Sequence, residues 1–395
     1  MREGKIKVNY RVMIQPQYQI FKSEGNGSFE MQLTECLNLF QSFLEANPDQ
    51  KPFIARVFIA AENQEQFSNR SKWVKEQQKV LNIPISVLAE APELPELVLI
   101  EAGFVCSSSH RVEYGNAAGI SYCKIESSGY SEYWLAGVEG EEKTLFENAR
   151  NAFARLLQAF LHLGIGFNQI CRQWNYVEQI FGIQEIEGKS RQNYQVFNEA
   201  RAEYYSKYRT VSGFPAATGI GTAFNGITIE CMAVECDDEV KTIAISNPKQ
   251  TNSYKYGQEV LKGEPQKSSK QNQVPQFERA RLMTNGASSR LFVSGTASII
   301  GQETIGIDDV EMQTRVTIAN IQSLVSEENL RVHYPELDAV PDKYAYVRVY
   351  VKNPEDISVV KTICSGYFRN VPVTFVQADI CRADLLVEIE AEMVN

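Results

Sequence analysis

Two stretches of this chain repeat one order of expected elements, namely strand, helix, strand, helix, strand, strand. They cover residues 133–234 and 291–394. In the first stretch an amphipathic helix is expected from about residue 143 to 162, because apolar residues recur there at helical spacing. In the second, Asp308 or Asp309 can cap a helix with the same spacing. The chain therefore carries the same unit twice.

The last strand, residues 385–391, places its carboxylates on one face. Glu388 and Glu390 alternate with aliphatic residues, so they share a side of the strand. Comparison of the two copies aligns Glu230 with Glu390 and sets Thr228 against Glu388, which makes Glu390 structural and Glu388 unique. An exposed or salt-bridged Glu388 is the alternative. A unique acid favours one site per chain, where the two halves meet.

The charge balance argues against several classes of partner. With 49 acidic and 39 basic residues the net charge is -10, which argues against binding to nucleic acid or anionic membranes. No apolar run has signal-peptide or membrane-helix length, so we expect a cytoplasmic protein. The eight Cys have no Cys-x-x-Cys pair and the three His are isolated. We expect no metal, no cofactor and no His-activated nucleophile.

Other stretches carry weaker predictions. Residues 262–275 are rich in Lys, Gln, Ser and Pro, which predicts a long loop that is either a solvated excursion or a flap over a site. The glycines of residues 213–222 suit tight turns. Residues 1–130 contain no motif with assignable chemistry.

The order of elements resembles the RidA (YjgF) fold, an α+β unit whose twisted sheet is backed by two helices. The matching motifs of the second copy are Ser294-Gly295, Asp309 with Gln313 and Asn320, Val349–Lys352, Val371-Pro372 and Val387–Ala391. The resemblance implies an α+β protein with two RidA-like units of mixed sheets backed by helices. RidA imine deaminases hold the substrate carboxylate with an Arg after this Pro, where this chain has Val373 and Thr374.

A closer resemblance is to the chorismatases, which join a RidA-like carboxyl-terminal domain to a diverged amino-terminal one. It lies in residues 208–221, 275–281, 294–301 and 379–388. At position 302 this chain has Gln, where much of the group has His. The resemblance implies a diverged domain at 1–240, with a degenerate unit at about 130–235, and a catalytic domain at 241–395.

The chorismatase resemblance also implies the chemistry. The substrate would be chorismate, a small dianion, and Glu388 would be the acid that protonates its enolpyruvyl ether and releases pyruvate. Cys381 lies seven positions before Glu388. In this respect the chain resembles the branch of the family that carries a Cys at this offset and forms 3-hydroxybenzoate. The other branch releases a dihydrodiol acid. A buried thiol without a role is the alternative.

Two carboxylates on the substrate require cations, and we select Arg209 and Arg348. Arg348 interrupts an apolar strand, where a cation is costly without an anionic partner. Tyr208 can donate a hydrogen bond, and the amide of Gly213 can approach a carboxylate closely. Internal salt bridges for both Arg residues, and simple packing for Tyr208, are the alternatives.

Two other functions stay open, a RidA-type imine deaminase and a metabolite-binding protein without chemistry. The oligomeric state is open as well. RidA proteins are trimers with sites between subunits. A homotrimer and a monomer with internal pseudo-symmetry both fit a chain that holds two copies.

Overall fold

The computed structural model describes residues 13–25, 27–81, 83–186, 188–266 and 269–395. Three of its long helices begin at residues whose side chains accept a hydrogen bond from the first helical turn. Ser28, Thr144 and Asp309 cap α1 (Phe29–Ala46), α3 (Leu145–Leu163) and α5 (Val310–Val325) in this way. Of the two predicted caps of α5, Asp309 is therefore the one used. α3 ends at Gly164, whose φ of 72° is left-handed.

The first predicted unit, here called unit 2, is present. Its strands lie in the order β12-β9-β13-β8, and the hairpin β7-β6 extends the sheet beyond β8. α3 and α4 cover the outer face through an apolar core that includes Phe153, Phe160 and Phe197. The other elements are β6 (Arg111–Ala117), β7 (Ile120–Ser127), β8 (Tyr130–Glu139), β9 (Ile170–Glu178), α4 (Asn193–Tyr208), β12 (Ala216–Thr222) and β13 (Ile227–Cys236).

The second predicted unit, here called unit 3, has the same connectivity. Its order is β20-β19-β21-β16, extended by β15 and β14. α5 and α7 pack on its outer face, and the short helix α6 (Glu327–His333) follows α5. The other elements are β14 (Lys241–Ile245), β15 (Ala280–Thr284), β16 (Ser289–Ala297), β19 (Lys343–Val351), α7 (Ile357–Tyr367), β20 (Val373–Gln377) and β21 (Val387–Val394).

The opening third, which has no motif in the sequence, folds as a third unit of the same topology, here called unit 1. Its order β3-β2-β5-β1 again places the last strand between the first and second, with the third parallel to the second. The elements are β1 (Gln17–Lys22), α1, β2 (Gln50–Ile59), α2 (Gln64–Leu81), β3 (Ile85–Leu88) and β5 (Val98–Cys106). The structure thus adds one unit to the two that the sequence predicts.

Short elements connect the units or extend them. They are β4 (Ala91–Pro92), which pairs with β20, the hairpins β10-β11 (Ile183–Ile186, Lys189–Gln192) and β17-β18 (Ile299–Ile300, Glu303–Thr304), and four 3-10 turns, at Phe167–Gln169, Ser253–Lys255, Gln258–Val260 and Pro354–Asp356. The last turn precedes α7 and has Pro in its first position.

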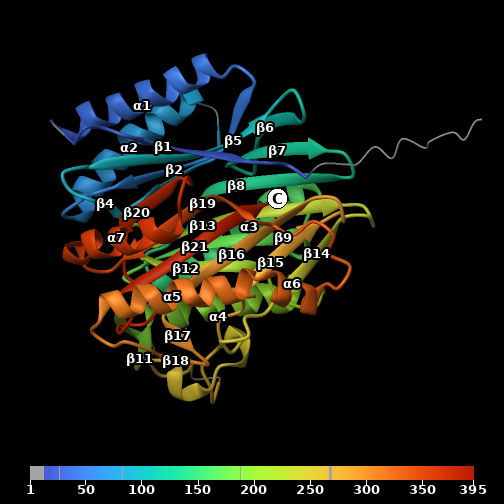
Figure 1. Cartoon of the computed structure of the whole chain (residues 1–395). Helices are drawn as coiled ribbons and strands as arrows, with labels where there is room; N and C mark the ends of the chain where they lie inside the picture. Colours follow the sequence, from blue (N-terminus) through green and yellow to red (C-terminus); the bar gives the residue numbers. More distant parts are fainter. Residues whose placement is uncertain (1–12, 26, 82, 187, 267–268) are drawn as a thin grey trace, which may run out of the picture.

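The three sheets turn their inner faces toward one another and their helices outward (Figure 1). One apolar cluster takes residues from all three sheets, among them Tyr18 and Phe53 of unit 1, Trp134 and Trp174 of unit 2, and Tyr346 of unit 3. Each unit keeps a separate core between its sheet and its own helices. The molecule is therefore arranged about a pseudo-threefold axis that runs through the shared core.

A chain of buried ion pairs joins the three sheets close to this axis. Arg56 of unit 1 lies 2.8 Å from Glu230 of unit 2 and 3.2 Å from Glu101 of its own unit. Arg348 of unit 3 pairs with both Glu101 and Glu390. Arg172 of unit 2 completes the chain, 2.8 Å from Glu390. All six side chains are at most 1% exposed, so each charge is compensated inside the protein.

The glycine-rich run at 213–222 differs from the prediction of tight turns. Residues 216–222 form the buried strand β12, parallel to β9, and only Gly213 has a positive φ (73°). The small residues serve close packing instead. A Cβ on Gly219 would lie 3.0 Å from the ring of Tyr194, and one on Gly221 would lie 2.7 Å from Cβ of Asp379.

Among the described residues, no helix combines the length and the apolar character needed to cross a bilayer.

Candidate active site

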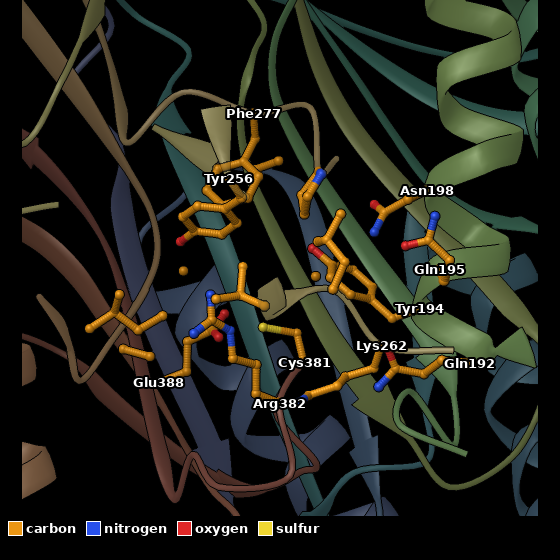
Figure 2. A pocket seen from close by; sticks show the side chains of 18 of the residues that line it. Gln192, Tyr194, Gln195, Asn198, Tyr256, Lys262, Phe277, Cys381, Arg382 and Glu388 are labelled. Carbon is orange, nitrogen blue, oxygen red and sulfur yellow. The ribbon is translucent and has the colours of Figure 1, made fainter. Parts of the chain in front are cut away.

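A pocket lies between units 2 and 3, as predicted for the meeting of the two halves. Its walls come from α4 and β12 of unit 2, from β16 and β21 of unit 3, and from the segment between β14 and β15. It holds about 710 Å³ of space, part of it open to solvent. Figure 2 shows Glu388, Cys381 and Arg382 on one side of the pocket and Gln195 and Asn198 of α4 on the other.

Glu388 enters this pocket from β21, in register with Ala297 of β16 and Tyr350 of β19. The side chain is 4% exposed, and its carboxyl has no hydrogen-bond partner among the described residues. Burial, and next the negative charge of Glu390, raise the pKa of Glu388 to about 8. This carboxyl therefore keeps its proton at neutral pH.

The backbone beneath the carboxyl leaves no room for another side chain. A Cβ on Gly295 would lie 1.9 Å from Oε1 of Glu388. The amide of Gly295 donates to Oγ1 of Thr218 at 3.0 Å, which ties this point of unit 3 to β12 of unit 2. The absence of a side chain at Gly295 thus allows the Glu388 carboxyl to lie directly against the backbone.

Cys381 lies beside Glu388 in the same pocket. Burial, and next the charge of Glu388, raise the pKa of the thiol to about 12. The sulfur is therefore a neutral thiol at physiological pH, not a thiolate nucleophile.

Two guanidinium groups, those of Arg279 and Arg382, line the pocket close to Tyr256. Their Cζ atoms lie 5.7 Å and 5.2 Å from the centre of the Tyr256 ring. Arg279 also donates to the Tyr256 hydroxyl at 2.6 Å, and Arg382 donates to the carbonyl of Gln302 at 2.7 Å. Nε of Arg279 and Nη2 of Arg382 have no acceptor among the described residues. Both cations therefore keep donors for an anionic ligand.

The wall opposite the acid is polar and comes from the start of α4. Tyr194, Gln195 and Asn198 line it, and the two amides are at most 2% exposed. Oδ1 of Asn198 accepts from Arg201 at 2.6 Å, while Nε2 of Gln195 has no acceptor within the described chain. This wall offers hydrogen bonds to an oxygen-rich ligand.

Of the residues predicted for the site, the structure brings only Glu388 and Cys381 to this pocket. Arg348 is fully buried in the ion-pair chain, where Glu101 and Glu390 use its charge. Arg209 donates to the carbonyls of Gly213 and Phe167, so it closes a turn of unit 2.

Tyr208 and Gly213 also lie outside the pocket lining. The ring of Tyr208 stacks on Phe167 at 6.0 Å. The positive φ of Gly213 serves a turn in which Oε1 of Glu278 accepts from the amide of Phe214 at 3.1 Å. Their tasks are packing and turn formation, which were the alternatives in the sequence.

The residues that sequence reasoning did not select are Arg279, Arg382, Tyr256 and the wall of α4. Arg279 and Arg382 stand in two of the blocks that carry the chorismatase resemblance, and this signal could have singled them out. Nothing in the sequence marks Gln195 or Asn198, because they sit in an ordinary helix.

The predicted loop at 262–275 runs beside the pocket, and its ends, Lys262 and Pro275, line it. The loop is held to unit 2 by backbone and side-chain contacts. Glu264 exchanges two hydrogen bonds with Ser190 of β11, at 2.8 Å and 2.9 Å. Gln302 accepts from the amide of Gly257 at 3.0 Å, a few residues before this loop begins. Residues 267 and 268 lie outside the described residues.

The sequence and the fold of this chain are similar to those of known proteins. Residues 105–233 match the family described as "Chorismatase FkbO/Hyg5-like, N-terminal". The chain is 30% identical to a 3-hydroxybenzoate synthase of Streptomyces hygroscopicus over 285 residues, which are 70% of this chain and 77% of that protein. It is 35% identical over 230 residues to a chorismatase of Streptomyces rapamycinicus, which are 57% of this chain and 64% of that protein.

A crystal structure of a chorismatase has the same fold. It superposes with a TM-score of 0.68 over 97% of this chain and 99% of that chain, at 22% identity. The predicted α+β fold is confirmed. The chain belongs to the chorismatase family.

Proposed function

We propose that this protein cleaves the enolpyruvyl ether of chorismate and forms pyruvate and 3-hydroxybenzoate. The family membership and the names of the relatives support the reaction. The observation that carries the proposal is the carboxyl of Glu388, which is buried in a pocket with two guanidinium groups and has a pKa of about 8.

The first step requires an acid. Glu388 donates its proton to the methylene carbon of the enolpyruvyl group, which becomes a methyl group, and the positive charge spreads onto the ether oxygen. An acid with a pKa near the working pH is suited to this transfer, because it is protonated beforehand and still releases its proton readily. The nearby Arg279 favours the carboxylate that remains.

The two substrate carboxylates require two cations, and we assign these contacts to Arg279 and Arg382. Each has a donor nitrogen without a protein acceptor. A guanidinium binds a carboxylate with charge-assisted hydrogen bonds, and two fixed cations hold the ether close to Glu388. Tyr256, close to both, holds both side chains in place.

Cys381 bears on which product the ring of chorismate becomes. The two products together contain every atom of chorismate, so no water is consumed, whereas a dihydrodiol acid needs one water. We propose that the neutral thiol of Cys381 occupies the space next to the ring and keeps water from that side. Its position in the pocket lining, partly buried beside Glu388, is consistent with this role.

The two-domain division proposed from the sequence fits this assignment. The boundary near residue 240 falls between β13 and β14. On this division, the carboxyl-terminal domain supplies the acid, the thiol and both cations, and the amino-terminal domain supplies the polar wall of α4.

The test is incubation with chorismate, with pyruvate measured by a coupled dehydrogenase assay and the aromatic product identified by mass. We expect equal amounts of pyruvate and 3-hydroxybenzoate. Glu388→Gln removes the transferable proton and should lower the rate at least about 100-fold. Glu336→Gln, at an exposed position, is the matched control and should keep full activity. An unchanged rate in Glu388→Gln would refute the assignment of the acid.

A further inference from the structure

A second cavity, with about 600 Å³ of space that is partly open to solvent, lies on the pseudo-threefold axis and takes its lining from all three units. We call it the axial cavity. Backbone contacts between units form its rim. The amide of Ala223 donates to the carbonyl of Ala89 at 3.0 Å, and the amide of Gly221 donates to the carbonyl of Asp379 at 2.7 Å. The pair of β20 and β4 closes the third junction.

Two charged residues line the axial cavity, Asp379 and Lys352, among mostly small apolar ones. The two do not form an ion pair within 4 Å in the described structure, although Lys352 acts electrostatically on Asp379. The Asp379 carboxyl has no hydrogen-bond donor among the described residues. Lys352 spends one donor on the carbonyl of Ala383, which leaves two. The cavity thus presents one carboxyl and one ammonium that lack full partners.

A buried carboxyl behind the same wall adds to the shortage of donors. Glu90 stands between the lining residues Ala89 and Ala91 and is 1% exposed. Neither of its carboxyl oxygens has a donor in the described part of the chain. Burial holds the pKa of Glu90 well above its usual range, so this carboxyl is neutral and adds a polar group, not a charge, behind the wall.

The axial cavity shares a wall with the candidate active site. On β12, Gly219 lines the active-site pocket and Gly221 lines the axial cavity. On the facing segment, Cys381 lines the first and Asp379 the second. Between them the fully buried Ile220 and Ile380 form an isolated β-bridge. Only Ile380 separates Asp379 from Cys381 in the chain, so the two cavities are lined by one continuous segment.

We propose that the axial cavity binds a small zwitterion of the amino acid class, with its ammonium group on Asp379 and its carboxylate on Lys352, and that its binding alters turnover in the neighbouring pocket. The first half stands on the cavity alone. The second half rests on the proposed function, because it is read out as a change in chorismate cleavage.

Binding is tested by isothermal titration calorimetry of the full chain with L-alanine, L-leucine and L-phenylalanine, and with methylamine and acetate as singly charged probes. We expect at least one amino acid to bind at least tenfold more tightly than either singly charged probe. Asp379→Asn and Lys352→Met should each weaken that binding at least tenfold. Asp338→Asn, an exposed carboxylate outside the cavity, is the matched control and should leave it unchanged. No binding at millimolar concentration, or equal binding of methylamine, would overturn the assignment.

Coupling is tested with the amino acid that binds. We expect it to change kcat or KM for chorismate at least twofold, and chorismate to change the affinity for the amino acid correspondingly, because binding linkage is reciprocal. Binding without any kinetic effect would overturn the coupling. If the protein does not cleave chorismate, the proposed function fails, while the calorimetric result on the axial cavity stands by itself.

Discussion

Two carboxyls on the same face of β21, those of Glu388 and Glu390, have pKa values shifted in opposite directions from the ordinary Glu value near 4.5. Burial, and next the charge of Glu390, raise the pKa of Glu388. Burial would raise the pKa of Glu390 as well, but Arg348 and Arg172 outweigh it and lower the pKa. The same residue type therefore becomes a proton donor or a permanent anion according to its neighbours.

The raised pKa of Glu388 predicts an alkaline limit to activity. If Glu388 donates the proton as proposed, its acid form is the active one, so kcat/KM should be constant below about pH 8 and fall tenfold per pH unit well above it. The measurement is a pH–rate profile of pyruvate release. A rate that continued to rise through pH 9 would show that another group supplies the proton.

The same shift predicts that the acid destabilises the fold at neutral pH. The pKa of Glu388 is higher in the folded than in the unfolded protein, so below about pH 4.5 the carboxyl is protonated in both states and costs no stability. As the pH rises from there toward 8, ionisation in the unfolded state lowers the free energy of unfolding. Glu388→Gln removes the titration and should raise the free energy of unfolding at pH 7 by up to roughly 3 kcal/mol. Denaturant unfolding at pH 7 and pH 5 checks this. The gain should shrink at pH 5, and a gain of equal size at both would contradict the explanation.

Gly295 sets the position of the acid, which predicts a large effect from one methyl group. In Gly295→Ala the new Cβ would take the place of Oε1 of Glu388 and turn the carboxyl away from its present position. Activity should fall about 100-fold while the fold persists, because the backbone of Gly295 is not left-handed. Gly286→Ala is not a suitable control, since φ there is 87°. Gly366→Ala, which meets nothing within 4 Å, is suitable.

At the level of single residues, the sequence selects a carboxyl that the structure places in the pocket, Glu388, but selects two Arg residues that lie outside it. Glu388 stands out because its counterpart in the other copy is Thr228. Arg348 looks like an anchor because it interrupts an apolar strand, yet one of its partners, Glu101, lies 247 positions away in unit 1. No local pattern reveals a partner at that distance. Arg382 lies only one position after Cys381, but a surface salt bridge would look the same in sequence.

At the level of elements, periodicity predicts most helices and strands correctly, and the exceptions have a common cause. β12 is read as turns because its glycines suit turns, whereas they serve contacts with Tyr194 and Asp379 from other elements. Unit 1 is not recognised because its strands keep the pattern of burial but none of the motifs. Tertiary contacts decide both cases, and a sequence pattern carries no direct record of them.

The ion-pair chain between sheets predicts an asymmetric cost of mutation. Arg56→Met leaves Glu230 and Glu101 buried with less compensation and should lower the free energy of unfolding by about 3–5 kcal/mol. The double variant with Glu230→Gln should cost less than the sum of the two single variants. Arg111→Met breaks an exposed pair and should cost under about 1 kcal/mol. Equal losses in Arg56→Met and Arg111→Met would contradict the role of burial.

At the level of the whole molecule, three units in one chain already surround the axis. We therefore predict a monomer, the second of the two states open from the sequence. Light scattering should give a mass near 44.6 kDa at micromolar concentration. Because one core and one ion-pair chain join the units, unfolding should be a single transition. A mass of three chains, or separate transitions for the units, would contradict this picture.

The covalent linkage of three like units has a consequence for how such a protein can change. In a ring of identical subunits each substitution appears at every interface between subunits. A residue that is needed at one interface must therefore be accommodated at all the others. Here the positions that match Glu388 hold Leu99 and Thr228, judged by their strand register beside Glu101 and Glu230. Each junction can vary independently: one retains chemistry, while the remaining two are free to acquire tighter packing or an unrelated ligand.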